Sequence, residues 1–417
     1  MSIEEMTARI KAEAERERAQ YAKPEPEPEN AINGQQAENN AGPLAFPDHI
    51  IKGAAGNFAD VLSDCMEPPR HFFFMAYLTC LGAVLAGRVT LKTELQPQPR
   101  LYTVVLGESA DDRKSTAINK TVDFFISALT FFQSCFGVGS AEGLQKRFQK
   151  DSNGATSNLL LVFDELKAFV GKSKVDGSVL LPCICTLFET NRYESHTKNN
   201  EIILTNAALS ILAASTIETY ERCWDSAFQD IGMTNRLFIV PGQGRRKHAI
   251  PCRVPYHEWD TMRDELGKVL SLANRCPELD FSPTAQSLYE AWYFNLEQSV
   301  HTKRLDTYAL RFMILLTVNA GKTEVDEAVI QNVIDLMNWQ LEARRLHDPI
   351  DADSAIAKIE EKIRRTLKPG KKTERELKRA IHANRCGTWV YSNALKNLSG
   401  ANEIFFDKKD NKWGLQC

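Results

Sequence analysis

Residues whose types and spacing can hold phosphate occur between positions 101 and 120. The apolar run 101–106 leads into Gly107 and a polar loop, which ends in Arg113-Lys-Ser-Thr116 at the start of a helical pattern. In such a strand–loop–helix unit, backbone N–H groups and the helix N-terminus face phosphates, a Lys reaches the terminal phosphate oxygens, and a Ser or Thr hydroxyl holds Mg²⁺. The segment therefore predicts a binding loop for ATP or GTP together with Mg²⁺.

This loop departs from the usual pattern G-x-x-x-x-G-K-[S/T] at two points. Gly107 and Lys114 are one residue too far apart, and Arg113 replaces the glycine that precedes the Lys. The alternative is an ordinary turn between a strand and a helix with a charged surface. The residues that we expect to contact a nucleotide are Gly107, Glu108, Ser109, Arg113, Lys114, Ser115 and Thr116.

A pair of acids follows the second apolar strand. The run 159–163 ends directly in Asp164 and Glu165. Doubly wound sheets bind ligands at the carboxyl ends of their strands, so these carboxylates are expected near the loop. In ATPases of this kind the first acid orients Mg²⁺ and the second polarises the attacking water. We therefore expect Asp164 at the metal and Glu165 as the base. The alternative is an acidic N-cap for the following helix.

Two further positions are candidates for chemistry at a γ-phosphate. The apolar run 209–214 ends in Ser215 and Thr216, and we expect Thr216, or its neighbour Ser215, to sense the γ-phosphate or the water. Arg236 opens another apolar strand, where it fits a finger that reaches a neighbouring subunit's nucleotide and stabilises charge on the phosphoryl group. The alternatives are a plain polar strand end and a surface arginine.

The elements that must position these residues form an alternating pattern. Apolar strands occur at 101–106, 159–163, 207–214 and 236–240, with helical segments between them. Strands that alternate with helices predict an α/β fold with a mainly parallel sheet and helices on both faces. A strand is also predicted at 88–94, and helices at 59–65, 71–85, 115–132, 257–274, 283–298, 303–319 and 324–346. Of these helices, 71–85 is apolar all round and is therefore expected to be buried.

Composition indicates a globular protein of two or three domains. The 417 residues are 43% hydrophobic and 25% charged. No apolar run reaches about 18 residues, the N-terminus lacks a secretion signal, and the ten cysteines form no Cys-x-x-Cys, so we expect a cytoplasmic protein without a membrane segment. The expected divisions are a disordered or helical arm (1–45), an α/β core (46–255), a helical region packed on the core (256–348) and a C-terminal module (354–417).

The C-terminal module is basic. Residues 354–417 hold fifteen Lys or Arg and seven Asp or Glu, a net charge of +8, whereas the whole chain carries −3. Helices are predicted at 354–367, from a capping box at Thr373 onward and at 387–398, followed by a hairpin at 403–415. This order resembles a winged helix, in which the third helix enters the major groove and the wing contacts phosphate. The lysines expected at DNA are Lys396, Lys408, Lys409 and Lys412. Docking of another protein is the alternative.

The order of these motifs resembles a known family. The family is the RecA-like, helicase-like ATPases of phages, plasmids and integrated elements, which are sometimes fused to primases, and the resemblance covers about 46–345. The segments that carry it are Gly-Glu-Ser-x-x-x-Arg-Lys-Ser-Thr116, Gly-Ser-Ala-Glu-Gly-Leu144, Val-Phe-Asp-Glu165, Leu-Phe-Glu-Thr-Asn-Arg192, the run that ends in Thr216, and Gly-Met-Thr-Asn-Arg-Leu-Phe238.

This resemblance implies residue roles and partners. It implies that Lys114 contacts the β- and γ-phosphates, that Ser115 and Asp164 hold Mg²⁺, and that Glu165 is the base. It also implies that Arg236 is a finger in trans, which needs a neighbouring subunit. A homo-oligomer such as a ring is therefore implied, with DNA and a primase or other replication protein as partners.

The sequence therefore predicts an ATP-dependent DNA helicase or translocase of DNA replication or mobile-element maintenance. The presence of both acids and Arg236 favours this function, because a pure switch needs neither a base nor a finger. Arg113 favours the alternative, a nucleotide-gated replication initiator or regulator with little hydrolysis. A third alternative is a defence-system ATPase whose partner is a protein.

Overall fold

Most of the chain from Leu44 onward has a defined structure. The computed structural model describes residues 44–416 except 109–111, 149–156, 197–200, 225–227, 229, 350–354, 382 and 384–386. Ser109 and residues 1–43 of the expected N-terminal arm therefore lie outside the described residues.

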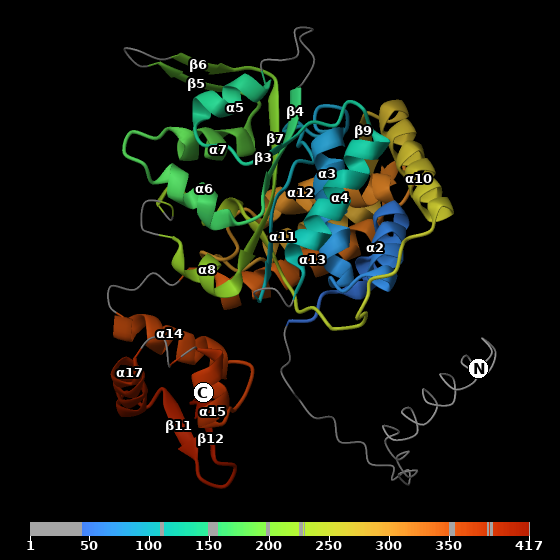
Figure 1. The fold of residues 1–417 in the computed structure, drawn as a ribbon. Coiled ribbons are helices and arrows are strands. Elements are labelled where there is room, and N and C mark those ends of the chain that lie inside the picture. Colours follow the sequence, from blue (N-terminus) through green and yellow to red (C-terminus); the bar gives the residue numbers. More distant parts are fainter. Residues whose placement is uncertain are drawn as a thin grey trace, which may run out of the picture. The chain divides into compact units, whose positions relative to one another are not determined.

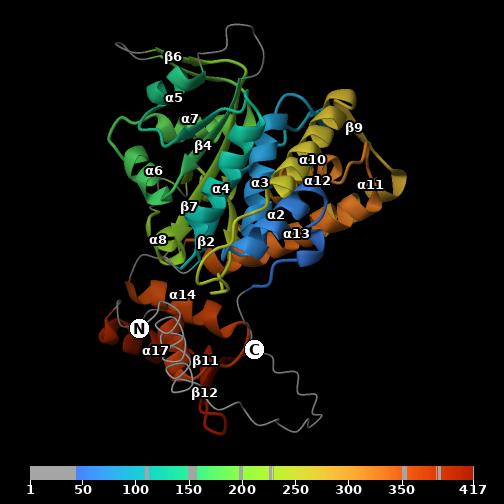
Figure 2. The same ribbon diagram turned by 45° about the vertical axis from the view of Figure 1, so that its right-hand side comes forward.

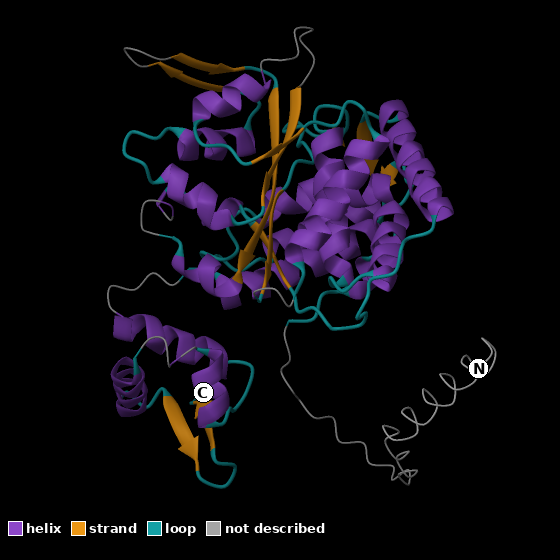
Figure 3. Cartoon of the chain, in the orientation of Figure 1, coloured by secondary structure: helices purple, strands orange, loops and turns teal. Residues whose placement is uncertain are grey.

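A five-stranded parallel sheet forms the centre of the core (Figure 3). In spatial order its strands are β3 (Ser134–Phe136), β4 (Ser157–Phe163), β7 (Ala207–Thr216), β2 (Tyr102–Gly107) and β8 (Phe238–Pro241). The inner strands are buried almost throughout, which explains why their sequences are apolar on both faces. The predicted α/β fold with a mainly parallel sheet is confirmed, and the arrangement is consistent with a RecA-like fold.

Helices cover both faces of this sheet, as predicted (Figures 1 and 2). One face carries α3 (Arg70–Leu85) and α4 (Lys114–Ala128). The other carries α5 (Ala141–Phe148), α6 (Leu166–Ser173), α7 (Leu180–Glu189) and α8 (Ile217–Arg222). From Phe72 to Leu85, α3 is buried on every side, because it lies between the sheet and further helices. The prediction of a fully buried helix at 71–85 is thus confirmed.

The further helices extend this side of the core: some pack on α3 or β8, and others pack on those helices in turn. They are α2 (Gly53–Cys65), α10 (Tyr256–Arg275), α11 (Pro283–Phe294), α12 (Leu305–Asn319) and α13 (Glu327–His347). Together with the sheet they enclose a continuous hydrophobic core, whose members run from Phe46 to Ala343.

The short strands were missed by the sequence-based prediction or predicted too long. The strand predicted at 88–94 is only β1 (Thr90–Leu91), which pairs in parallel with β9 (Glu278–Phe281), and β9 pairs with β10 (Glu324–Val325). The helix predicted from position 324 accordingly begins at Glu327. A hairpin of β5 (Tyr193–His196) and β6 (Glu201–Leu204) was also missed. Runs of two to four residues are too short to display the period that identifies a strand.

The C-terminal module has an apolar cluster of its own. Its elements are α14 (Ala355–Leu367), α15 (Glu374–Ala380), α17 (Thr388–Gly400) and an antiparallel hairpin of β11 (Ile404–Asp407) and β12 (Lys412–Leu415). The capping box is confirmed, because the Thr373 hydroxyl accepts the Glu376 N–H at 3.3 Å and the Glu376 carboxylate accepts the Thr373 N–H at 2.8 Å. The winged-helix identity of the module stays a prediction.

A buried arginine ties α13 to the segment that leads into β8. Arg344 is 1% exposed, and its guanidinium donates to the carbonyl oxygens of Lys303 at 2.7 Å and His301 at 3.0 Å. It also donates to the carbonyl oxygens of Asn235 at 3.1 Å and Leu237 at 3.3 Å. A buried cation needs such partners, and these carbonyl groups would otherwise be left without donors.

Replacing this arginine tests the tie. Arg344→Met should lower the free energy of unfolding by about 3 kcal/mol, because buried carbonyl groups lose their donor. The matched control is Arg345→Met, since Arg345 makes partly exposed ion pairs with Glu297 and Glu342, which are worth about 0–1 kcal/mol. Urea unfolding followed by far-UV circular dichroism measures both. Equal losses in the two variants would contradict the role assigned to Arg344.

Candidate functional site

The carboxyl ends of β2, β4 and β7 meet at one edge of the sheet. Gly107, the last residue of β2, pairs with Thr216, the last residue of β7. Phe163, the last residue of β4, pairs with Ala213, so the acids that follow β4 continue beside Ser215. This edge brings together the loop, the acids and the hydroxyls, as expected where a doubly wound sheet binds its ligand.

Lys114 lies over the loop. It begins α4, is buried, and its Nζ donates to the carbonyl oxygens of Glu108 at 2.7 Å and Gly107 at 3.1 Å. Burial lowers the pKa of Lys114, while the negative charges of Asp112 and Glu165 act in the opposite direction. An ammonium group held against loop carbonyls can exchange them for phosphate oxygens, so this placement suits the predicted contact with phosphate.

Arg113 has a backbone conformation that favours glycine. Its φ of 48° and ψ of 34° lie in the left-handed region, which costs an L-residue roughly 1–2 kcal/mol and costs glycine almost nothing. The Arg113 guanidinium pairs with Glu67, with 3.0 Å between Nε and Oε2. Arg113 stands where the usual pattern has glycine, so a residue with a side chain occupies a conformation that favours glycine.

Ser215 faces the candidate base. It is fully buried near the end of β7, and its Oγ lies 3.2 Å from Oε1 of Glu165 and 3.2 Å from the Thr216 carbonyl oxygen, either of which can accept its proton. Glu165 is exposed and occupies the N-cap position of α6, but its side chain makes no capping hydrogen bond. The carboxylate is therefore directed toward Ser215 rather than toward the helix, where it can polarise a water molecule.

Thr216 makes different contacts. Its side chain caps α8, since its Oγ1 accepts the N–H of Thr219 at 3.1 Å and donates to the Thr219 hydroxyl at 2.8 Å. Consecutive residues of a strand point to opposite faces, which explains why the two neighbours differ. Of the two hydroxyls that the sequence left open, Ser215 is the one beside Glu165. Sensing by Thr216 stays a prediction.

The candidate metal ligands have the chemistry that Mg²⁺ requires. Ser115 and Thr116 are partly buried in the first turn of α4, and Asp164 is exposed directly after β4. Mg²⁺ prefers oxygen ligands and usually takes one or two from the protein together with phosphate oxygens. The Asp164 carboxylate and the Ser115 hydroxyl fit a Mg²⁺ that enters with a nucleotide. Among the described residues, no group of three or more His, Cys, Asp or Glu side chains is gathered as a metal site.

Arg236 lies at the amino ends of the strands, whereas the loop lies at their carboxyl ends. It precedes β8, which runs parallel to β2, so it belongs to the amino end of the sheet while Gly107 belongs to the carboxyl end. Its guanidinium donates to the carbonyl oxygens of Ile231 at 2.8 Å and Gly232 at 3.1 Å, and lies 3.7 Å from Glu189. The side chain is 12% exposed, so contact with a neighbouring subunit requires it to leave these partners.

The lysines predicted to contact DNA lie in the C-terminal module. Lys396 is exposed on α17, Lys408 and Lys409 are exposed in the turn of the hairpin, and Lys412 is partly buried at the start of β12. Exposed aromatic residues of this module that were not predicted are Trp389, Phe405 and Phe406. Aromatic side chains near lysines are typical of surfaces that stack the bases of single-stranded nucleic acid.

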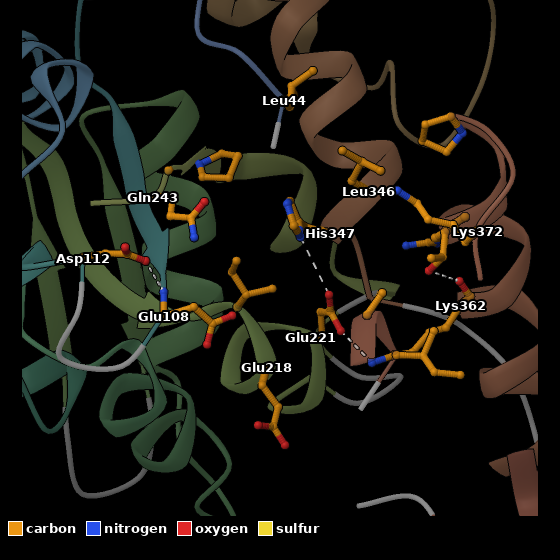
Figure 4. Close-up of a pocket in the computed structure, with 18 residues that line it drawn as sticks. Leu44, Glu108, Asp112, Glu218, Glu221, Gln243, Leu346, His347, Lys362 and Lys372 are labelled. Carbon is orange, nitrogen blue, oxygen red and sulfur yellow. Dashed lines mark hydrogen bonds and ion pairs between the residues drawn. The ribbon is translucent and has the colours of Figure 1, made fainter. Parts of the chain in front are cut away.

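A cavity of about 430 Å³ lies beside the loop (Figure 4). Glu108, Asp112 and Gln243 line it at the carboxyl edge of the sheet, and Lys362 and Arg365 line it from α14. Its volume falls within the range of about 300–1,000 Å³ that is usual for small-molecule sites.

An ion-pair network crosses the wall of this cavity. Lys362 Nζ donates to Oε2 of Glu221 at 2.7 Å, and His347 Nδ1 lies 3.7 Å from Oε1 (Figure 4). Burial raises the pKa of Glu221, but His347 and Lys362 outweigh burial and hold the pKa below its usual value. Glu221 is therefore an anion at neutral pH, which keeps Lys362 beside the cavity.

Comparison with solved structures finds a distant similarity. No family profile and no curated protein matches the sequence. Among solved structures, the full-length MCM homolog from Methanopyrus kandleri aligns with a TM-score of 0.41 and 12% identity, over 71% of this chain and 60% of that one. At this level no functional role is transferred from that protein. Within the described residues, no helix is long and apolar enough to cross a membrane.

Mutation should distinguish the roles of the Ser215 and Thr216 hydroxyls. Under the ATPase activity expected from the sequence, Ser215→Ala, which removes the hydrogen bond to Glu165, should lower ATP turnover about tenfold with little change in stability. Thr216→Val removes a helix cap and should cost about 1 kcal/mol of stability, and its effect on turnover shows whether Thr216 also senses the γ-phosphate. Steady-state ATP hydrolysis and thermal denaturation measure the two effects. Loss of turnover in Thr216→Val with normal turnover in Ser215→Ala would reverse the assignment.

Proposed function

We propose that this chain is a RecA-like ATPase that couples ATP hydrolysis to work on DNA, as a helicase or translocase of replication or mobile-element maintenance. The observation that carries the proposal is the arrangement at the carboxyl edge of the sheet. There Lys114 lies over the loop that follows β2, and Asp164 and Glu165 follow β4. The strand between β2 and β4 is β7, and its Ser215 forms a hydrogen bond with Glu165.

Each side chain at this edge has one task in the proposed reaction. Lys114 binds the β- and γ-phosphates, and Ser115 and Asp164 hold Mg²⁺. Glu165 takes a proton from the attacking water, and Ser215 fixes the carboxylate of Glu165 by its hydrogen bond. Mg²⁺ bound with ATP neutralises charge on the transferred phosphoryl group. The cavity beside the loop has room for the rest of the nucleotide.

The proposed active form is a homo-oligomer. Arg236 is on the amino edge of the sheet, whereas the loop is on the carboxyl edge, so this arginine can serve only the nucleotide of a neighbouring subunit. An arginine supplied in trans stabilises the charge that develops during phosphoryl transfer. Glu189, which lies 3.7 Å from Arg236, would hold the side chain until the neighbour arrives.

DNA is the proposed macromolecular partner. The basic C-terminal module carries the exposed Lys396, Lys408 and Lys409, and Lys412 at the edge of the hairpin. Such cations bind phosphate without reading sequence, and the winged-helix order of the elements suits a groove. We place the protein in the cytoplasm, with a primase or another replication protein as a further partner.

One observation favours a second candidate function. The groups of the loop that would hold phosphate are already bonded within the chain, which suits a nucleotide-gated DNA-binding initiator with slow turnover. The two functions differ in whether ATP is consumed.

ATP turnover with and without DNA separates them. Hydrolysis by the full chain should rise with single- or double-stranded DNA, and both Lys114→Ala and Glu165→Gln should abolish the increase. Loss of a general base costs about 10²–10⁴-fold, and Glu165→Gln should still bind ATP. Lys120→Ala is the matched control, because Lys120 is exposed on the same helix as Lys114. ATP binding without turnover in the wild type would support the initiator instead.

The dependence of DNA affinity on salt tests the C-terminal module. The logarithm of the affinity for duplex DNA should fall linearly with the logarithm of salt concentration, by about 0.9 for each phosphate contacted. Lys408→Ala combined with Lys409→Ala should reduce that slope by about two contacts. Lys268→Ala, at an exposed position of α10, should leave it unchanged. A flat salt dependence in the wild type would indicate that the module docks a protein.

A further inference from the structure

A carboxylate of the chain itself lies inside the loop. Asp112 is 1% exposed, and its Oδ2 accepts the backbone N–H of Glu108, directly after β2. Its Oδ1 accepts the backbone N–H of Gly244, which follows β8, at 2.5 Å. Figure 4 shows the Asp112 carboxylate directed at the backbone of Glu108. Two backbone donors at the carboxyl edge of the sheet are thus already bonded to an anion.

Gly107 is required by this carboxylate. A Cβ added to Gly107 would lie 2.5 Å from Oδ2 and 2.8 Å from Cβ of Asp112, closer than real contacts allow. Gly107 is not in the left-handed region, so its backbone conformation is open to any residue. The glycine that the sequence marks as the start of a phosphate loop therefore provides the space in which Asp112 packs.

The cation of the loop is also engaged. Lys114 Nζ donates to the carbonyl oxygens of Gly107 and Glu108, so the ammonium group and the Glu108 N–H both have partners within the same few residues. A carboxylate that accepts backbone N–H groups makes the kind of charge-assisted bond that a phosphate oxygen makes in such a loop. Among the described residues of the loop, the Glu108 N–H and the Lys114 ammonium group are thus both bonded within the chain.

We propose that Asp112 is an internal anion that competes with the phosphates of the nucleotide for this loop and so sets the affinity for ATP. The inference rests on the proposed function, because it concerns the same site. To bind phosphate, the loop must release Asp112 from the Glu108 N–H, and only the fraction of molecules in which it is released is competent. The observed affinity is reduced by that fraction.

Removing the charge should therefore tighten binding. Asp112→Asn keeps the shape of the side chain, and Asp112→Ala removes it. Both should bind a non-hydrolysable ATP analogue about tenfold more tightly than the wild type in calorimetric titration, since one charge-assisted hydrogen bond no longer competes. Asp123→Asn, on the exposed face of α4, removes the same charge outside the loop and should bind as the wild type does.

The outcomes are distinct. Equal or weaker binding by Asp112→Asn, with a wild type that does bind, would overturn the internal anion and show that Asp112 only clasps the segments after β2 and β8. Thermal denaturation without nucleotide shows whether each variant is folded. If wild type and all variants fail to bind nucleotide although folded, the proposed function falls and the inference falls with it. Binding by Asp112→Asn alone would support the inference in its strongest form.

Discussion

The structure depends on the backbone pairing of β7 with β2 on one side and β4 on the other. This pairing sets both the separation and the facing of the groups at the carboxyl edge. Phe163 pairs with Ala213, so continuing the register by two residues brings Glu165 opposite Ser215, and the side chains at the two positions share a face. A slip of one residue would turn Ser215 away from Glu165 and present Thr216 instead. The loop follows β2 and the acids follow β4, and these two strands do not pair with each other. The distance between the loop and the acids is therefore set by β7, which lies between the two strands and itself supplies only a hydroxyl.

Around this sheet, buried guanidinium groups donate hydrogen bonds to backbone carbonyl groups that capping residues satisfy in other proteins. Arg100 donates to the carbonyl oxygens of Leu187 at 2.8 Å and Thr190 at 3.0 Å, and Arg311 donates to that of Phe188 at 2.6 Å, so the C-terminal carbonyl groups of α7 have donors from two other elements. Burial lowers the pKa of Arg311 to about 10, which still leaves it charged at neutral pH. Arg344 acts in the same way beside Arg236. These ties hold the amino edge of the sheet to the helices and keep Glu189 and Arg236 in place.

Sequence patterns predicted what is long and apolar. The strands that became β2, β4, β7 and β8 are continuous apolar runs, and α3 is apolar all round, so burial on every side was readable from composition alone. The loop, the acids and the hydroxyls were found because they follow those runs. The choice between Ser215 and Thr216 was not available, since it depends on the register between strands. The hydrogen bonds of Arg344 could not be predicted either, because the sequence does not distinguish a buried arginine from an exposed one. β1, β9 and β10 were missed or shortened because their partners, not their own residues, make them strands.

Each departure of the loop from the usual pattern has a structural counterpart. A glycine before the Lys is favoured where the backbone is left-handed, and Arg113 accepts that conformation while its side chain pairs with Glu67. The longer spacing from Gly107 to Lys114 gives the loop one residue more than a phosphate cradle needs, and Asp112 fills the space that Gly107 leaves open. Asp112 lies within the lengthened stretch between Gly107 and Lys114, and under the proposed competition a bound phosphate and Asp112 would need the same backbone donor, the N–H of Glu108.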